Sequence, residues 1–156
     1  MLFPNCEVRA CPDETTLRTF LEGHREPMRL AVLDRHGTPQ IATLWFRYEA
    51  GALWGVSHAE AWLTRRLQRA PKVGFEISTG LAPYRGLRGQ GTVTLLPEAG
   101  GTQLDHLLAR YGIGEESRLA RWLQGRRDEE WALRLAPSKA TFWDYAPRMT
   151  EPRAHG

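Results

Sequence analysis

The sequence lacks the features that mark membrane, secreted and metal-binding proteins. No apolar run approaches the roughly 20 residues that a membrane helix needs. The first residues lack a charged segment followed by an apolar one, so we expect no signal peptide. Only two cysteines occur, Cys6 and Cys11. Without a secretory signal we expect both to be free thiols in a reducing cytoplasm. No His or acidic partner stands at ligand spacing from them, so we expect no metal site.

Motifs of protein-borne catalysis are also missing. The sequence has no G-x-S-x-G, HExxH, GxxxxGK[ST] or CxxC motif. The five histidines are scattered, and no two stand at the spacing of helical metal ligands. We therefore predict neither a catalytic triad nor a zinc site, and we assign no catalytic residue. If the protein is an enzyme, a bound cofactor carries the difficult chemistry.

The excess of positive charge is small. There are 21 Lys and Arg against 18 Asp and Glu, which gives a formal net charge of +3. This balance fits an anionic ligand such as a phosphate, and it is too even to indicate nucleic acid. The basic segment 62–69 and nearby aromatic residues leave one alternative, a barrel face that binds a single strand by stacking. The expected partner is a small molecule, with no nucleic acid and no membrane.

Short segments rich in β-branched and aromatic residues alternate with turn signals from residue 29 onward. His36-Gly37 and Ala50-Gly51 are hairpin signals. Strands are expected at 29–34, 40–48, 52–57, 72–78, 84–96, 130–136 and 139–145. Because short turns join most of them, we expect a mainly β fold, a six- to seven-stranded antiparallel split barrel with peripheral helices. It forms a single domain over residues 1–146, followed by a disordered tail at 147–156.

The expected strand 84–96 has glycines on the face that points inward. Leu87, Gly89, Gly91, Val93 and Leu95 alternate with polar residues. Glycine inside a strand usually marks a bend or the close approach of another group, and a small barrel needs both.

Helices are expected outside the barrel. Asp13 can cap a helix that runs to about residue 22, with Leu17, Phe20 and Leu21 on its apolar face, as a lid over one end of the core. A basic helix is expected at 60–69, and a helical insert at 102–126.

Residues 29–95 resemble the pyridoxamine 5′-phosphate oxidase-like family, the flavin-binding split β-barrels. The matching segments are RLAVLDRHGTPQIATLWF, LWGVSHAEAWLTRRLQRAPKVGFEI and YRGLRGQGTVTLL. The closing segment WALRLAPSKATFWDYAP also looks like the last two strands of the family. The resemblance implies a homodimer with flavin mononucleotide (FMN) bound at the subunit interface.

The resemblance also implies positions for the cofactor contacts. The residues that would line the isoalloxazine ring are Thr43, Leu44, Trp45 and Phe46. Arg47 matches a basic position beside the ring or the phosphate, and Ser57 and His58 match the strand end that meets the phosphate. On the outward face of the expected strand 84–96, Arg85 and Arg88 could be solvated or could reach the site across the dimer. Trp143 could close the cavity from the partner chain.

The start of the helix at 60–69 departs from the family pattern. Where family members usually carry a Ser-Arg-Lys-like cluster, this sequence has Ala61, Trp62 and Leu63. Arg65 and Arg66 follow one turn later. Arg66 lies three residues after Leu63, on nearly the same face, so it could hold the phosphate as a fork donor or be a solvated surface residue. Trp62 could stack on a ring or fill the pocket.

Two functions remain open at this stage. The first is a homodimeric FMN-dependent oxidoreductase that acts on a small redox substrate. The second is a non-catalytic carrier or sensor that binds a flavin, a deazaflavin or haem and has a degenerate phosphate site.

Overall fold

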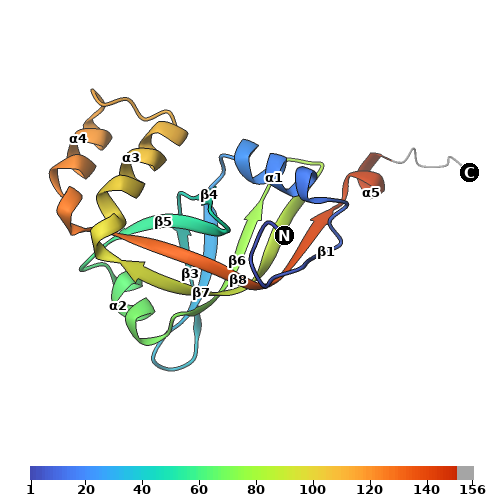
Figure 1. Ribbon diagram of the computed structural model, residues 1–156, viewed down its shortest axis with the longest axis horizontal. Helices are drawn as coiled ribbons and strands as arrows, with labels where there is room; N and C mark the ends of the chain where they lie inside the picture. Colours follow the sequence, from blue (N-terminus) through green and yellow to red (C-terminus); the bar gives the residue numbers. More distant parts are fainter. Residues whose placement is uncertain (151–156) are drawn as a thin grey trace, which may run out of the picture.

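Eight strands form one sheet within residues 1–150, the part of the chain that the computed structural model describes (Figure 1). The strands are β1 (Val8–Arg9), β2 (Met28–Leu33), β3 (Pro39–Leu44), β4 (Arg47–Glu49), β5 (Ala52–His58), β6 (Lys72–Ser78), β7 (Arg85–Leu96) and β8 (Glu130–Asp144). Their order is β3-β2-β6-β7-β8-β5-β4, every pairing in that order is antiparallel, and β1 adds in parallel to β8. The predicted mainly β, antiparallel barrel fold is confirmed.

The two ends of this strand order, β3 and β4, are consecutive in the chain. Only Trp45 and Phe46 separate them, so this kink in the chain connects the two edge strands of the sheet. The sequence predicted one strand over 40–48, and the structure corrects this to two. The backbone N–H of Phe46 donates to the hydroxyl of Tyr111 (3.2 Å) while its ring is fully buried. The backbone at Phe46 therefore makes no strand pairing, and the phenyl ring of Phe46 is buried in the core instead.

The last strand, β8, is continuous, although the sequence predicted separate strands at 130–136 and 139–145. It pairs with β7 from Arg85↔Asp144 to Leu96↔Ala132. One register shift, next to Gly91, accommodates Pro137 and Ser138 within the strand. A bulge is a place where a sheet tolerates proline, which has no N–H for the ladder.

The glycines of β7 permit the close approach that the sequence predicted. A Cβ on Gly89 would lie 2.1 Å from the carbonyl oxygen of Lys139, and one on Gly91 would lie 2.5 Å from that of Ala136. On either side of these two glycines, Leu87 and Val93 are buried in the barrel core. Neither glycine can therefore carry a side chain without displacing β8.

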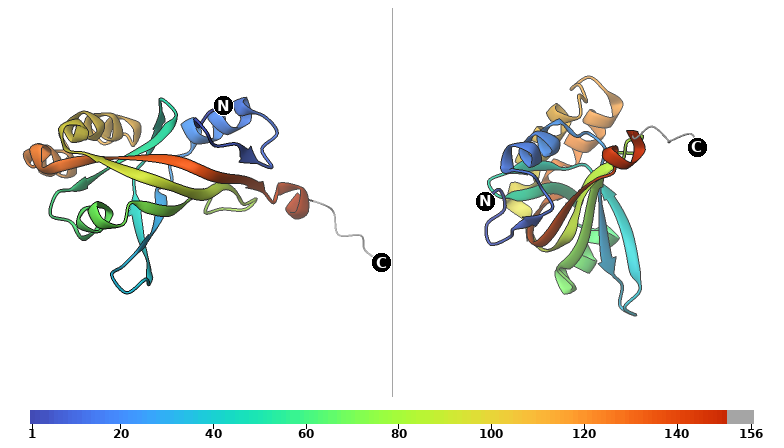
Figure 2. Two further views of the ribbon diagram at one scale, coloured as in Figure 1. Left: turned by 60° about the horizontal axis from the view of Figure 1, so that its bottom comes forward. Right: turned by 90° about the vertical axis from the view of Figure 1, so that its right-hand side faces the viewer.

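Five helices lie outside the barrel within the described residues (Figure 2). They are α1 (Glu14–Gly23), α2 (Trp62–Arg69), α3 (Gly100–Arg110), α4 (Arg118–Gly125) and α5 (Ala146–Thr150). None of the helices in this part of the chain is long and apolar enough to cross a membrane. Helix α5 occupies the start of the tail predicted at 147–156, and residues 151–156 lie outside the described residues.

Helix α1 is the predicted lid. The side chain of Asp13 accepts the N–H of Thr16 (2.7 Å), which caps the first turn. Leu17, Phe20 and Leu21 are buried in the barrel's main hydrophobic cluster. The apolar face therefore closes one end of the core, as the periodicity predicted.

The side chain of Arg110 ties α3 to the end of α1. Its guanidinium donates to the carbonyls of Leu21 (2.8 Å), Glu22 (3.0 Å) and His24. The last carbonyls of a helix have no partner within the helix, so an arginine placed there satisfies them. The helical insert is thus fixed to the lid as well as to the sheet.

His24 gives the fold a dependence on pH. Its ring stacks on Phe20 (centroids 5.0 Å apart), and burial lowers its pKa from the usual 6.5; Arg110 and Arg85 lower it further, whereas Glu26 opposes them. The unfolded chain therefore takes up a proton at higher pH than the folded chain. Stability is fully present above pH 6.5 and is lost as the pH falls below it.

We expect His24→Phe to remove this part of the pH dependence. Urea unfolding of wild type and variant at neutral pH and at about pH 5 measures the difference between their slopes. A variant that loses as much stability on acidification as the wild type does would contradict the assignment to His24.

Candidate functional site

A groove of about 440 Å³ lies between the barrel wall and the helical insert. Its floor comes from the kink after β3 and from the outer face of β5, and its roof comes from α3 and α4. A second hydrophobic cluster, Leu104, Leu108 and Ala120, holds the two helices together and packs against Trp45 and Val56. The insert thus covers one outer face of the barrel.

The walls of the groove are mostly apolar. The apolar side chains that line it are Leu44, Trp45, Val56, Leu104, Leu119 and Leu123. The ring of Trp45 stacks on Tyr111, with centroids 5.1 Å apart and planes 19° apart. Because the hydroxyl of Tyr111 also accepts the N–H of Phe46, the insert holds the indole in one orientation. A rigid aromatic surface of this kind suits a planar ligand.

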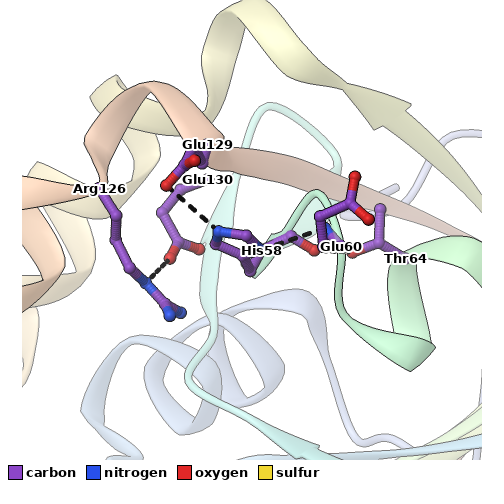
Figure 3. A network of polar contacts seen from close by, with 6 residues as sticks. All are labelled: His58, Glu60, Thr64, Arg126, Glu129 and Glu130. Atoms are coloured by element: carbon purple, nitrogen blue, oxygen red, sulfur yellow. Dashed lines mark hydrogen bonds and ion pairs between the residues drawn. The ribbon is translucent and has the colours of Figure 1, made fainter.

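One end of the groove is polar, where β5 ends and β8 begins (Figure 3). His58 and Glu130 are register partners on these strands. The side chain of Glu130 is only 2% exposed, and its Oε1 accepts a hydrogen bond from Nε of Arg126 (2.8 Å). The guanidinium of Arg126 also lies 3.9 Å from the ring centroid of Trp122. A carboxylate at this depth requires such a charged partner.

The imidazole of His58 is held from two sides. Its Nδ1 accepts the backbone N–H of Glu60 (3.1 Å), so the neutral ring carries its proton on Nε2. That nitrogen faces Oε2 of Glu129 at 3.3 Å. Thr64 donates to the carbonyl of His58 (2.7 Å) and fixes the backbone there. The groove therefore has an N–H donor of defined direction at its polar end.

Five of the predicted cofactor contacts line this groove. They are Thr43, Leu44, Trp45, Ser57 and His58. The first three lie at the end of β3 and in the kink, and the last two at the end of β5. Segments that are distant in sequence therefore meet at one surface here.

Phe46 and Arg47 are placed differently. The ring of Phe46 is 0% exposed in the barrel core and does not line the groove. The guanidinium of Arg47 forms an ion pair with Glu49 (2.6 Å) and a hydrogen bond with Gln103 (3.1 Å). Both side chains already have structural partners in the protein without ligand.

No residue of α2 lines the groove. Trp62 is 49% exposed, and Arg65 pairs with Glu60 on the surface. Arg66 donates to the carbonyls of Leu33 and Asp34 (3.1 Å for Asp34), at the hairpin that joins β2 to β3. The lining of the groove includes Ala61 from this region and neither of these two arginines.

Arg88 lies in a second depression, a trough of about 570 Å³ on the outer face of the sheet. Arg29, Glu76 and Arg88 are successive register partners across β2, β6 and β7, and Lys139 lines the same trough. Trp143 pairs with Gly86 further along β7 and β8, and its indole N–H has no hydrogen-bond partner within residues 1–150.

The sequence did not identify the residues that complete the groove. Leu104, Leu119, Leu123, Arg126 and Glu130 all line it. Helical periodicity indicated that the leucines lie on apolar faces, but periodicity does not say which surface such a face covers. No local signal distinguishes Glu130 or Arg126 from other surface charges.

The two cysteines have no metal-ligating cluster around them in the part of the chain that the structure describes. Within residues 1–150 no group of three His, Cys, Asp or Glu side chains gathers in a way that could hold a metal ion. Cys6 and Cys11 are free, and burial raises the pKa of both thiols. Thiols with raised pKa values are weak nucleophiles at neutral pH.

Comparison with known proteins identifies solved structures that share this fold. No family model and no curated protein sequence matches the chain. A conserved hypothetical protein from Mycobacterium tuberculosis has a solved structure with a TM-score of 0.76 at 20% identity, covering 96% of this chain and 97% of that one. An F420 reductase gives a TM-score of 0.66 at 20% identity, covering 83% and 98%.

A protein from Listeria innocua assigned as a pyridoxamine 5′-phosphate oxidase gives a TM-score of 0.64 at 17% identity, covering 83% of this chain and 96% of that one. Structures with the same fold also include a FAD-binding protein from Mesorhizobium loti and a haem storage protein from Vibrio cholerae. The predicted resemblance is confirmed at the level of the fold.

Proposed function

Because the chain has the split-barrel fold of pyridoxamine 5′-phosphate oxidase-like and flavin-binding proteins, we propose that it binds a flavin-type cofactor, FMN or a deazaflavin, in the groove under α3 and α4. In this proposal it is an oxidoreductase that acts on a small substrate. The observation that carries the proposal is the groove itself. It joins apolar walls to a polar end at the place where Thr43, Trp45 and His58 were predicted to meet a cofactor.

The size and lining of the groove fit such a group. Its volume of about 440 Å³ lies within the range of about 300–1,000 Å³ that is usual for small-molecule sites. The leucines and Trp45 offer apolar surface to a flat ring system. The donors at the other end, Ser57, His58 and Arg126, suit a hydroxylated and phosphorylated chain.

The chain's own residues bind, orient and exclude water. Trp45, held by Tyr111, sets the plane of the ring system. Leu104 and Leu123 cover it from the insert and remove water from around it. A bound flavin-type group supplies hydride exchange at its ring, so no side chain of the protein needs to be a nucleophile.

The arrangement of His58 favours a flavin-type group over haem. His58 is the histidine that lines the groove, and both of its ring nitrogens already have partners, Glu60 and Glu129. To bind a haem iron, the imidazole of His58 would have to give up one of these contacts. A carrier or sensor without turnover remains the second candidate, because Arg65 and Arg66 have partners outside the groove.

The proposal includes a homodimer formed through the trough on the outer sheet face. Ala31, Gly74 and Gly89 form its floor, and Ile41 at its edge is 66% exposed. A floor of small residues allows another chain to approach closely. Covering the exposed side chain of Ile41 would remove its apolar surface from water, which favours association. Light scattering on the purified protein tests this part. The proposed setting is the cytoplasm, which the two free thiols support.

The absorption spectrum of the purified protein and titration with FMN, a deazaflavin and haem test cofactor binding. We expect binding of a flavin-type group and no binding of haem. Leu119→Trp adds bulk at a groove-lining position that is 41% exposed, so it should lower the affinity at least tenfold without unfolding the protein.

Leu81→Trp is the matched control, because Leu81 is 81% exposed and does not line the groove. The affinity of this variant should equal that of the wild type. If wild-type protein bound neither FMN nor the deazaflavin, or if Leu119→Trp bound as well as Leu81→Trp, the groove would not be the site.

A further inference from the structure

We propose that Arg126 is the anion-binding residue of the groove and holds the phosphoryl group of the ligand. This inference rests on the proposed function. It places phosphate binding at the end of α4, because the start of α2 has no cation that faces the groove in this chain. The juxtaposition that carries it is a guanidinium at the groove's polar end, held by a buried carboxylate and an aromatic ring.

The start of α2 offers no cation to the groove. Its first residues are Ala61, Trp62 and Leu63. Of the arginines one turn later, Arg65 is paired with Glu60, and Arg66 bonds to backbone carbonyls of the β2–β3 hairpin. A phosphate placed at this end of the barrel therefore needs another positive charge.

Arg126 is the only Lys or Arg among the described residues that line the groove. Its Nε is used by Glu130, and its two terminal nitrogens form no hydrogen bond with any described residue. In Figure 3 these nitrogens point away from the carboxylate of Glu130. Two parallel N–H donors with a free edge match the oxygens of a phosphate in a bidentate manner.

The guanidinium is also held in place before any ligand arrives. Glu130 is 2% exposed and fixed by strand pairing with His58, and the ring of Trp122 packs against the guanidinium at 3.9 Å. The side chain of Arg126 is only 29% exposed, so it has little freedom left to lose on binding. Restriction before binding lowers the entropy cost of holding the anion.

The negative charge of Glu130 does not prevent this role. Its carboxylate neutralises the Nε edge of the guanidinium and lies on the opposite side from the free edge. An anion that approaches from the free edge contacts the terminal N–H groups of Arg126 before it comes near the carboxylate of Glu130. The Nε2 of His58 already faces the exposed Glu129 at 3.3 Å, so Arg126, whose terminal nitrogens have no partner among the described residues, is the donor that we assign to the anion.

The experiment compares FMN with riboflavin, which has the same ring but no phosphate. Fluorescence titration gives the affinity of each for the full-length protein. The wild type should bind FMN at least tenfold more tightly than riboflavin, and Arg126→Ala should abolish that preference while leaving the affinity for riboflavin unchanged. If the wild type prefers a deazaflavin, the same comparison uses that deazaflavin with and without its phosphate.

Arg121→Ala is the matched control, because Arg121 is an exposed arginine of α4, the helix that Arg126 caps, and it does not line the groove. It removes the same charge and should keep the preference for FMN. Arg126→Ala leaves the buried carboxylate of Glu130 unpaired and can unfold the protein. The double variant Arg126→Met with Glu130→Gln removes both charges together and should lose the preference in a folded protein.

The possible results distinguish a failure of the Arg126 assignment from a failure of the proposed flavin binding. If the wild type binds no flavin or deazaflavin, the proposed function fails. If the wild type binds FMN and riboflavin equally, or if both Arg126 variants keep the preference for FMN, Arg126 does not hold the phosphate although the groove binds the ring. An equal loss for both ligands would show that Arg126 only shapes the groove, which also overturns the inference.

Discussion

Replacing Gly100 with alanine is expected to be among the most damaging single changes in this protein. A Cβ at this position would lie 1.6 Å from the carbonyl oxygen of Glu130 and 2.4 Å from its carbonyl carbon. Both atoms are backbone, so no side chain can rotate away to make room. Helix α3 and the start of β8 must move apart, and we expect a loss of about 3 kcal/mol or more in the free energy of unfolding.

Gly101→Ala is the natural control for this change. A Cβ on Gly101 would meet the side chain of Arg127, which can move, at 2.7 Å. Alanine also gains up to about 1 kcal/mol of helix propensity over glycine. Urea unfolding should therefore show a near-neutral effect at position 101 and a large one at position 100. Equal midpoints for the two variants would mean that α3 does not pack on β8 at this distance.

Phe46→Ala is the second change with a large expected effect, and it acts on stability. The ring is 0% exposed, and the guanidinium of Arg110 lies 4.9 Å from its centroid. Truncating a buried phenylalanine leaves a cavity and typically lowers the free energy of unfolding by about 3–5 kcal/mol. Thermal and urea unfolding measure this loss directly.

Trp62→Ala is the control for Phe46→Ala. The resemblance predicted both residues as cofactor contacts, but the side chain of Trp62 is 49% exposed. Its removal should change the stability by no more than about 0.5 kcal/mol. If Phe46→Ala were as stable as Trp62→Ala and lost only cofactor affinity, then Phe46 would face the ligand and its placement in the core would be wrong.

The sequence predicted those parts of the fold that local patterns determine. The hairpin after β4 turns at Ala50 and Gly51, both with positive φ (48° and 75°), where the turn signal predicted it. The alternation in β7 and the cap of α1 at Asp13 were likewise visible over a few residues. Each of these features depends on neighbours within one turn or one strand.

The parts that the sequence missed depend on contacts between distant segments. The break between β3 and β4 requires Tyr111, more than 60 residues away, to take the N–H of Phe46. The continuity of β8 through Pro137 is decided by the bulge against β7. The groove is completed by Leu104 and Arg126 only because the insert folds back over β5. No local pattern carries that information.

The insert leaves and re-enters the sheet at adjacent points, because Leu96 at the end of β7 is the register partner of Ala132 in β8. Residues 97–129 thus occupy the place of a hairpin loop, and the barrel's strand register does not depend on their length. They supply the roof of the groove, whereas the barrel supplies its floor. A change confined to this one segment between β7 and β8 would therefore reshape the roof of the groove while leaving the paired strands beneath it in place.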